Sequence, residues 1–579
     1  MNYEPRTSTD SHYVPQQTKK GYDQIQALPN HVIKQIAAGE VISSTAAVVR
    51  ELVENALDAK ADRLTISLDE QLSCIQVADN GEGITLENLR CCASPHTTSK
   101  IQTFADLQKI VSLGFRGEAL HSLTQIASLQ IFSRPRYPES GMGYGVQYNQ
   151  GGTVVSEKTI ALAPGTIVSV SDLFKDLPAR RHALPKVSQQ LKTIQKTIYE
   201  IALAHPYLTW QVYHQDRLWL HLSPGETPQQ LFPQILPKFQ QSDFQYICHR
   251  ITLPEITEES QLELVVGLPD RASRHKGDWI KTAINGRCVR LPELEQTLIS
   301  GLMRTLPRDR HPICWLHLHT HPSFIDWNRH PSKAEIYLRH LSFWREKTIH
   351  ALDEVLKLNP ETVPETFHNQ RLGELLKVGE EKGSYQVTTT QKKEKEAVNL
   401  IPLSAIAQLH NTYIIAEHPS GIWLIEQHIA HERIIYEQLE AQWQLTPQDP
   451  PLILNHLSLS QQEQLERLGI EIDAFGEDTW AIRTVPKILQ QRDDLTDAII
   501  ELSQGGDLQT AQVATACRSA IRNGTPLSVP EMQEILDGWQ RTRHPHTCPH
   551  GRPIYLSLAE TSLAKFFRRH WVIGKSHGI

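Results

Sequence analysis

The most constraining feature of the sequence is a charged and polar stretch between about residues 358 and 398. It contains the runs Glu380-Glu-Lys-Gly and Thr388-Thr-Thr-Gln-Lys-Lys-Glu-Lys. Such a composition buries too little apolar surface to join a core and is typical of a linker. A chain of 579 residues is also longer than a single core usually serves. The stretch therefore divides the chain into a long N-terminal part and a shorter C-terminal part.

Helix-like and strand-like segments alternate before this linker, a pattern typical of mixed α/β domains. The first residues are polar and have no apolar period, so they predict a disordered extension. We expect an extension over 1–22, a first domain over 23–235, a second over 236–357, a linker over 358–398 and a C-terminal domain over 399–579.

Composition limits the classes of function. The formal charge of −7 argues against a surface that coats nucleic acid, so any DNA contact should be confined to local patches. No apolar run is long enough to cross a bilayer and no signal peptide is visible, so a cytoplasmic protein is expected. Eight cysteines, with Cys91 and Cys92 adjacent, suit a reducing compartment, where metal ligation is the more common chemical role.

The run Ser43-Ser-Thr-Ala-Ala-Val-Val-Arg-Glu-Leu-Val-Glu-Asn-Ala-Leu-Asp-Ala predicts a helix that begins after a Ser or Thr cap. Val49, Leu52, Val53 and Ala56 form its apolar stripe. A polar stripe lies opposite and consists of Glu51, Glu54, Asn55 and Asp58. Taken alone, that polar stripe is most simply a solvated helix face.

Two further runs change this interpretation. Residues 64–68 and 75–77 alternate as strands do, and the second leads into Asp79-Asn-Gly-Glu-Gly-Ile. Gly81 and Gly83 would let the backbone approach a flat ligand while the Asp79 carboxylate accepts from an exocyclic amine. Downstream, Leu113-Gly-Phe-Arg-Gly-Glu-Ala-Leu sets glycines before a helix start, where backbone N–H groups favour phosphate.

Together, these three motifs resemble the nucleotide-binding fold of the GHKL ATPase superfamily. Within it the chain resembles the MutL family, over roughly residues 24–350. Further matches are Leu28-Pro, Ile36-Ala-Ala-Gly-Glu-Val, His96-Thr-Thr-Ser-Lys, Gly165-Thr, Asp172-Leu-Phe, Pro178-Ala-Arg-Arg, Asn285-Gly-Arg and His330-Pro-Ser-Lys. The resemblance implies a Bergerat-type ATP-binding sandwich, a second domain with a ribosomal-protein fold and a small α+β C-terminal domain. Pro95 and Lys175-Asp-Leu depart from the pattern, in the lid and a nearby loop.

The resemblance also implies roles for single residues. Glu51 would be the general base that activates water, and Asn55 the Mg2+ ligand. Lys333 would reach the terminal phosphate of ATP from the second domain, which would couple domain closure to the triphosphate. The remaining ATP-binding residues implied are Asp79, Gly81, Gly83, Thr98, Lys100, Gly114, Phe115, Arg116, Gly117 and Thr166.

Basic residues gather at Arg180 and Arg181 and again at Arg287, within the Asn285-Gly-Arg motif. A solvated face explains such runs as readily as DNA contact does. In the family the second domain lines a positively charged groove, so the resemblance implies that these arginines bind double-stranded DNA through phosphates, without sequence specificity.

A metal site is indicated after the linker. Glu426-Gln-His-Ile-Ala-His-Glu-Arg places His428 and Glu432 four apart, on one face if helical. Ala516-Cys517-Arg518 and Cys548-Pro-His550-Gly-Arg-Pro add thiol and imidazole donors, a set that suits Zn2+ or Mn2+ better than Mg2+.

These motifs, with Phe567-Arg-Arg, resemble the nicking endonuclease motifs of MutL proteins. Glu426 stands where the family has Asp, and Ile429 where it has Ala. The resemblance implies metal-assisted hydrolysis of a phosphodiester with catalytic carboxylates at Glu426 and Glu432. The longer Glu426 side chain leaves a second interpretation open, in which the metal site is structural and the protein is an ATP-gated matchmaker that recruits other nucleases.

The resemblance further implies a homodimer joined through the C-terminal domain, a MutS-type mismatch sensor as partner and association with the nucleoid on DNA. Residues 442–447, Gln442-Trp-Gln-Leu-Thr-Pro, have the pattern of a sliding-clamp peptide, which also arises by chance. Another ATPase of the superfamily is disfavoured, because no phosphoacceptor helix domain and no Toprim-like continuation is visible.

Overall fold

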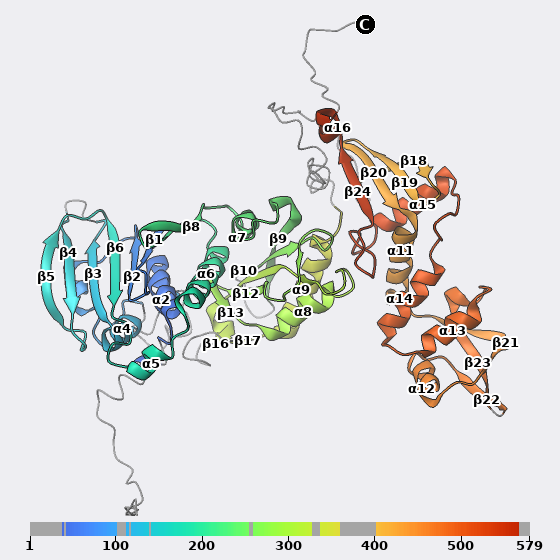
Figure 1. Ribbon diagram of the computed structural model, residues 1–579, viewed down its shortest axis with the longest axis horizontal. Coiled ribbons are helices and arrows are strands. Elements are labelled where there is room, and N and C mark those ends of the chain that lie inside the picture. Colours follow the sequence, from blue (N-terminus) through green and yellow to red (C-terminus); the bar gives the residue numbers. More distant parts are fainter. Residues whose placement is uncertain are drawn as a thin grey trace, which may run out of the picture.

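The computed structural model describes residues 38–39, 42–100, 112–114, 117–137, 141–253, 259–326, 336–358, 401–476 and 478–566. Within them, helices and strands form three groups along the chain, shown from blue to red in Figure 1. The mixed α/β multidomain class expected from the sequence is confirmed. The predicted N-terminal extension and nearly all of the predicted linker lie outside the described residues.

The first group is built on an eight-stranded sheet of order β5-β4-β3-β6-β2-β1-β7-β8. Leu64, Ile66 and Leu68 are buried and alternate with partly exposed residues, as the sequence predicted for a strand covered on one face. The pairs are antiparallel except β1 with β7, which is parallel. The strands are β1 (Arg63–Leu68), β2 (Cys74–Asp79), β3 (Ser128–Arg134), β4 (Gly143–Tyr148), β5 (Val154–Ile160), β6 (Gly165–Ser171), β7 (Thr209–His214) and β8 (Arg217–Leu222).

Helices cover one face of this sheet. The central helix α2 packs on β2 and on α6, and its apolar stripe, including Val49, Leu52 and Val53, is buried. Ser44 caps α2 by accepting from Ala47 N–H at 3.2 Å, a contact worth about 1 kcal/mol. The helices are α2 (Thr45–Asp58), α3 (Leu86–Cys91), α4 (Ala119–Ile126), α5 (Pro178–His182), α6 (Val187–Ala204) and α7 (Phe232–Ile235).

The second group has a five-stranded sheet of order β13-β12-β15-β10-β9, which leaves β9 at an edge. One face packs against α8 (Pro292–Leu302) and α9 (Leu341–Val355). Val265, Ala283 and Trp315 on the other face belong to the same apolar core as α6. The core is therefore continuous across the predicted boundary at 235/236. The strands are β9 (Phe244–Thr252), β10 (Glu259–Gly267), β12 (Ile280–Ile284), β13 (Arg287–Val289) and β15 (Cys314–His319).

The C-terminal group contains two sheets. One has the order β18-β19-β20-β24 and packs against α11 and α15, while the other has the order β21-β23-β22 and lies beyond α14 (Figure 1). The strands are β18 (Ser404–Leu409), β19 (Tyr413–His418), β20 (Gly421–Glu426), β24 (Tyr555–Ala559), β21 (Leu445–Asn455), β22 (Ile472–Gly476) and β23 (Thr479–Pro486). The helices are α11 (Gln427–Ala441), α12 (Leu459–Arg467), α13 (Leu495–Ser503), α14 (Leu508–Ser519), α15 (Val529–Gln540) and α16 (Glu560–Phe566).

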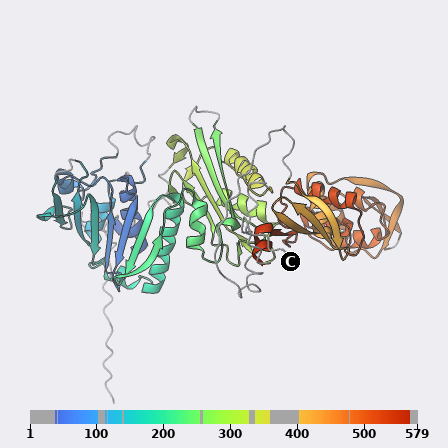
Figure 2. The same cartoon turned by 90° about the horizontal axis from the view of Figure 1, so that it is seen from above.

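Figure 2 shows the second group between the other two, and hydrogen bonds join it to the C-terminal group. The fully buried Arg433 on α11 donates to the Arg304 carbonyl at 2.9 Å, and Thr547 donates to the Thr305 carbonyl at 2.5 Å. Among the described residues, none of the helices combines the length and apolar character that a bilayer crossing requires.

Candidate functional site

The polar face of α2 forms the base of the candidate nucleotide site. Glu51, Asn55 and Asp58 are partly exposed on one side of the helix, as their spacing predicted. Glu54 departs from the predicted stripe, because it is 4% exposed and turned toward the second group. Its carboxylate pairs with Arg287 on β13 at 2.5 Å, which keeps its charge from being buried alone.

Asp79 lies at the end of β2, beside α2, as predicted. Its Oδ1 accepts from Gly81 N–H at 2.8 Å, and the Thr166 amide also donates to the carboxylate. Burial raises the pKa of Asp79 to about 6, although these two amides partly oppose the shift. A carboxylate so placed can accept from the exocyclic amine of a base once it is ionised.

The glycines after Asp79 are required by the protein itself. A Cβ on Gly81 would lie 2.5 Å from the Ala59 carbonyl oxygen, and a Cβ on Gly83 would lie 2.1 Å from that of Arg134. Gly83 also has a φ of +74°, in the left-handed region. The structure shows that these glycines make room for neighbouring backbone, and their predicted role beside a flat ligand stays a prediction.

The loop before α4 faces α2 through Asp58. The Asp58 carboxylate accepts from Leu113 N–H and Gly114 N–H, each at 2.9 Å, and pairs with the Lys100 ammonium. Lys100 Nζ also donates to Asn55 Oδ1 at 3.3 Å. The loop amides predicted to bind phosphate and Lys100, predicted to bind ATP, are therefore close together and engaged by an anion of the protein.

The other predicted nucleotide residues fall in two sets. Thr98 Oγ1 accepts from Lys100 N–H at 3.1 Å, and Thr166 is buried with its hydroxyl 2.9 Å from Ser133 Oγ. Gly117 has a φ of +62°, and a Cβ there would meet the Thr97 carbonyl at 2.5 Å. Phe115, Arg116 and Lys333 lie outside the described residues.

The predicted DNA-contacting arginines differ in exposure. Arg181 on α5 is exposed, and Arg180 is partly exposed, with its guanidinium 5.3 Å from the centre of the Phe174 ring. Arg287 is 6% exposed and donates to Glu54 and to the Leu113 carbonyl. Its donors therefore bridge the first two groups, and a phosphate contact of Arg287 stays a prediction.

A second candidate site lies on α11. This helix places His428 and Glu432 on one face, as predicted. The Glu432 side chain is fully buried, and its carboxylate lies 2.9 Å from His550 Nδ1 and 3.2 Å from Arg552 Nη2. Burial alone would raise the pKa of Glu432, but the neighbouring His550 and Arg552 lower it. The Cys548 thiol accepts from His550 N–H at 3.3 Å.

His428 and Cys517 complete this arrangement. His428 Nδ1 lies 2.9 Å from the Ile521 carbonyl, so the Nδ1 proton is donated there and Nε2 is left as an acceptor. That Nε2 lies 4.0 Å from Cys517 Sγ. Cys517 in turn hydrogen-bonds Glu432. We call Glu432, Cys548, His550, His428 and Cys517 the C-terminal cluster.

The C-terminal cluster fits a divalent cation by two observations. Ligand atoms of Glu432, Cys548 and His550 all lie within 4.8 Å of one another. Glu432 Oε1 is buried and makes no regular hydrogen bond within the described part of the chain, although it faces His550. Burial raises the pKa of Cys517 to about 11, so a bound cation would have to displace its proton. Imidazole, thiolate and carboxylate donors suit Zn2+ or Mn2+.

Glu426 occupies a different place. It is the N-cap of α11, with Oε2 accepting from Ile429 N–H at 2.5 Å, and Oε1 accepting from Asn523 at 2.5 Å. Both carboxylate oxygens therefore have partners outside the C-terminal cluster. A local signal for this was present, since an acidic residue directly before a helical pattern is a common cap.

Two residues were missed as participants from the sequence. Arg552 contacts the buried Glu432. It belongs to the motif Cys548-Pro-His550-Gly-Arg-Pro, and its place four residues after Cys548 could have indicated that it lies near the C-terminal cluster. Asp58 was assigned only to the polar stripe, yet it holds the phosphate-loop amides.

The predicted sliding-clamp peptide, 442–447, runs into β21. Leu445, Thr446 and Pro447 pair with β23, and Trp443 donates to the Leu468 carbonyl at 3.1 Å. Clamp binding by this segment stays a prediction.

Three family models match successive parts of the chain. Residues 42–167 match "Histidine kinase-, DNA gyrase B-, and HSP90-like ATPase", residues 244–357 match "DNA mismatch repair protein, C-terminal domain", and residues 406–527 match "MutL C terminal dimerisation domain".

Curated relatives match nearly end to end. "DNA mismatch repair protein MutL" of Rippkaea orientalis is 56% identical over 96% of this chain and 99% of its own length. The protein of the same description from Crocosphaera subtropica is 57% identical over 96% and 99%. That from Methanoculleus marisnigri is 31% identical over 94% and 99%.

Proposed function

The chain belongs to the MutL family of DNA mismatch repair proteins, and from that premise we propose that it is an ATP-gated homodimeric clamp on DNA with a metal-dependent nicking site at the C-terminal cluster. The chain contains a GHKL ATPase domain and a MutL C-terminal dimerisation domain. What we propose beyond these domains is DNA nicking, the binding of metal ions, contact with duplex DNA and the roles of single residues.

In the N-terminal half, Glu51 is the base that takes a proton from water as the terminal phosphate of ATP is released. Asn55 supplies an oxygen to Mg2+ without adding negative charge beside the phosphates. Asp79 accepts from the adenine amine. When ATP binds, the amides of Leu113 and Gly114 release the Asp58 carboxylate and donate to phosphate oxygens instead. Lys333 contacts the terminal phosphate, which only the triphosphate has.

The observation that carries the nicking proposal is the meeting of donors from three distant motifs around the buried Glu432. Zn2+ or Mn2+ bound there would polarise a phosphodiester and lower the pKa of water. His428 is oriented by the Ile521 carbonyl, and Arg552 orients Glu432. Arg552 is also half exposed, so it can attract the negative backbone of the duplex.

The test is nicking of supercoiled DNA by the full-length protein with Mn2+. We expect the wild type to convert the plasmid to open circles, and Glu432→Lys and His550→Ala to lose this conversion. His456→Ala removes an exposed histidine of the same group and serves as the matched control. Equal traces from the wild type and Glu432→Lys would overturn the nicking proposal.

A second function is favoured by Glu426. Because both of its oxygens are engaged by Ile429 and Asn523, it is held away from direct ligation. In that case the C-terminal cluster would be structural, and the protein would be an ATP-gated matchmaker that recruits other nucleases. Metal binding without nicking would support this alternative.

The proposed partners follow from the family. The homodimer would form through the C-terminal group, and Arg180 and Arg181 would contact phosphates of double-stranded DNA without reading sequence. A MutS-type sensor would report the mismatch, with a sliding clamp at residues 442–447 as a further partner. The proposed location is the cytoplasm, on nucleoid DNA.

A further inference from the structure

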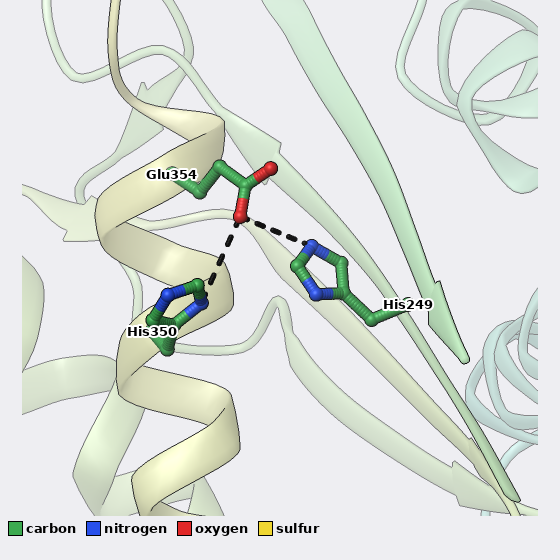
Figure 3. A group of neighbouring side chains, drawn as sticks. All are labelled: His249, His350 and Glu354. Carbon is green, nitrogen blue, oxygen red and sulfur yellow. Dashed lines mark ion pairs between the residues drawn. The ribbon is translucent and has the colours of Figure 1, made fainter. Parts of the chain in front are cut away.

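The second group contains a cluster of two imidazoles and a carboxylate on the side of its sheet that faces α9 (Figure 3). Glu354 Oε2 lies 3.3 Å from His249 Nε2 and 3.7 Å from His350 Nδ1. The ligand atoms of all three residues lie within 4.8 Å of one another. The His249 side chain is partly exposed, at 26%, and those of His350 and Glu354 are exposed, at 71% and 46%, so solvent ions can reach them.

The backbone holds these donors in place. His350 and Glu354 are four residues apart on α9, so they share one face of the helix. His249 comes from the edge strand β9, opposite Leu262 on β10, and Leu262 is buried against the helices. Residues opposite each other on paired strands point to the same face, which directs His249 toward α9. Figure 3 shows both rings turned toward the Glu354 carboxylate.

The spacing and the donor types match a transition-metal site. Donors at the 2.0–2.2 Å bond lengths of zinc lie roughly 3.3–3.6 Å apart in a tetrahedron. The two distances from Glu354 Oε2 to the imidazole nitrogens, 3.3 and 3.7 Å, are close to this range. Two imidazole nitrogens and one carboxylate oxygen suit Zn2+, Co2+ or Ni2+ and disfavour Mg2+ and Ca2+, which prefer oxygen ligands only. The exposure of His350 leaves the fourth position to water.

The other unassigned cluster of this kind is weaker. Glu263, His317 and His319 also bring their ligand atoms within 4.8 Å. His317 Nε2 accepts from Gly286 N–H at 2.9 Å, so the ring carries its proton on Nδ1, the atom that faces Glu263. That tautomer leaves His317 without a lone pair for an ion in the cluster.

We propose that His249, His350 and Glu354 form a second metal site, which binds one zinc-type divalent cation per chain and fastens the end of α9 to the edge strand β9. The ion would join a strand at the sheet edge to the last two turns of the helix. Because α9 is the last helix before the predicted linker, the site would anchor the helix from which the C-terminal group is tethered. The inference does not depend on nicking or on the C-terminal cluster.

Cobalt titration of the full-length, chelator-treated protein tests the proposal, because Co2+ reports its own ligands. At the C-terminal cluster, cysteine thiolates give a charge-transfer band, whereas a site of two imidazoles and a carboxylate gives only weak d–d bands. The charge-transfer band therefore reports the C-terminal cluster alone. We expect His350→Ala to bind one Co2+ fewer per chain than the wild type, with the charge-transfer band unchanged.

A matched control is Glu346→Gln, which removes an exposed carboxylate from the same helix outside the triad. We expect this variant to bind as many Co2+ per chain as the wild type. Zn2+ should also raise the melting temperature of the wild type by more than that of His350→Ala. His350 is 71% exposed, so circular dichroism should show the same fold in both variants.

Two results would overturn the proposal. One is a cobalt count in His350→Ala or His249→Ala that equals that of the wild type. The other is the loss of one Co2+ per chain in His319→Ala with the charge-transfer band unchanged, which would assign the ion to the neighbouring cluster of Glu263 and His319.

Discussion

The nucleotide site and the C-terminal cluster prepare their charged groups in opposite ways. At the nucleotide site, the amides of Leu113 and Gly114 and the Lys100 ammonium are already engaged by Asp58. At the C-terminal cluster, donors face one another around the buried Glu432, and second contacts orient them. If the proposed ligands bind, the first site would exchange an internal partner for its ligand, whereas the second would need only a cation and the release of protons. Nucleotide binding would then rearrange contacts within the protein, whereas metal binding would add an ion to donors that are already in place.

The largest effect is expected when the base is removed from the nucleotide site. Glu51→Ala should lower the rate of ATP hydrolysis by about 10²–10⁴-fold, the usual contribution of a general base, while ATP binding is kept. Asn55→Ala should lose both binding and turnover, because the Mg2+ oxygen is lost. Steady-state phosphate release and calorimetry with an unhydrolysable ATP analogue measure the two quantities. Unchanged hydrolysis in Glu51→Ala would remove it from the proposed role.

The next effect tests whether Arg552 orients the Glu432 carboxylate before a metal ion binds. Arg552→Ala frees Glu432 Oε2 from its partner at 3.2 Å, so zinc affinity should fall by roughly 10–100-fold. Competition with a coloured chelator measures this affinity. Arg522→Ala is the control, since it removes an exposed cation whose recorded ion pair is with Asp494. Equal affinities in both variants would mean that Arg552 does not position the ligand.

A smaller effect tests directly the hydrogen bonds between Asp58 and the phosphate-loop amides. Asp58→Asn weakens the anion that holds the phosphate-loop amides, so ATP should meet less competition. The loss of one charge-assisted contact corresponds to an increase in ATP affinity on the order of tenfold. Titration with the unhydrolysable analogue checks the sign, and an affinity at or below that of the wild type would contradict the exchange.

The smallest effect is a pH dependence at the adenine position. Burial raises the pKa of Asp79 to about 6, and its ionised form accepts from the adenine amine more strongly than its protonated form does. Affinity should therefore fall by up to about fourfold between pH 7 and pH 5.5, as the ionised fraction falls. The control ligand is the analogous triphosphate of a purine without the exocyclic amine, because the titration of its phosphates is the same. Identical pH profiles for both ligands would exclude Asp79 as the adenine contact.

Local features of the fold could be predicted because interactions between residues close in sequence determine them. The Ser44 cap, the alternation in residues 64–68 and the helical spacing of His428 and Glu432 each depend on neighbours within one or two turns. The motif order then indicated which distant donors belong together, and the C-terminal cluster brings them into contact.

Pairings between distant segments could not be predicted in this way. Glu54 shares its spacing with the exposed groups of α2, but a partner 233 residues away decides its burial. The triad of the second group is similar, since only His350 and Glu354 carry a local signal. His249 joins them because strand order places β9 at the edge beside α9.

The shared apolar core of the first two groups has a consequence for how the protein melts. Since Val265, Ala283 and Trp315 pack in the same cluster as α6, neither group can lose its structure without exposing apolar surface of the other. Heating should therefore unfold them in one cooperative transition. A chimera in which only one of the two groups comes from a relative would have mismatched apolar surfaces where the groups pack together. The two groups are therefore best exchanged as a single unit.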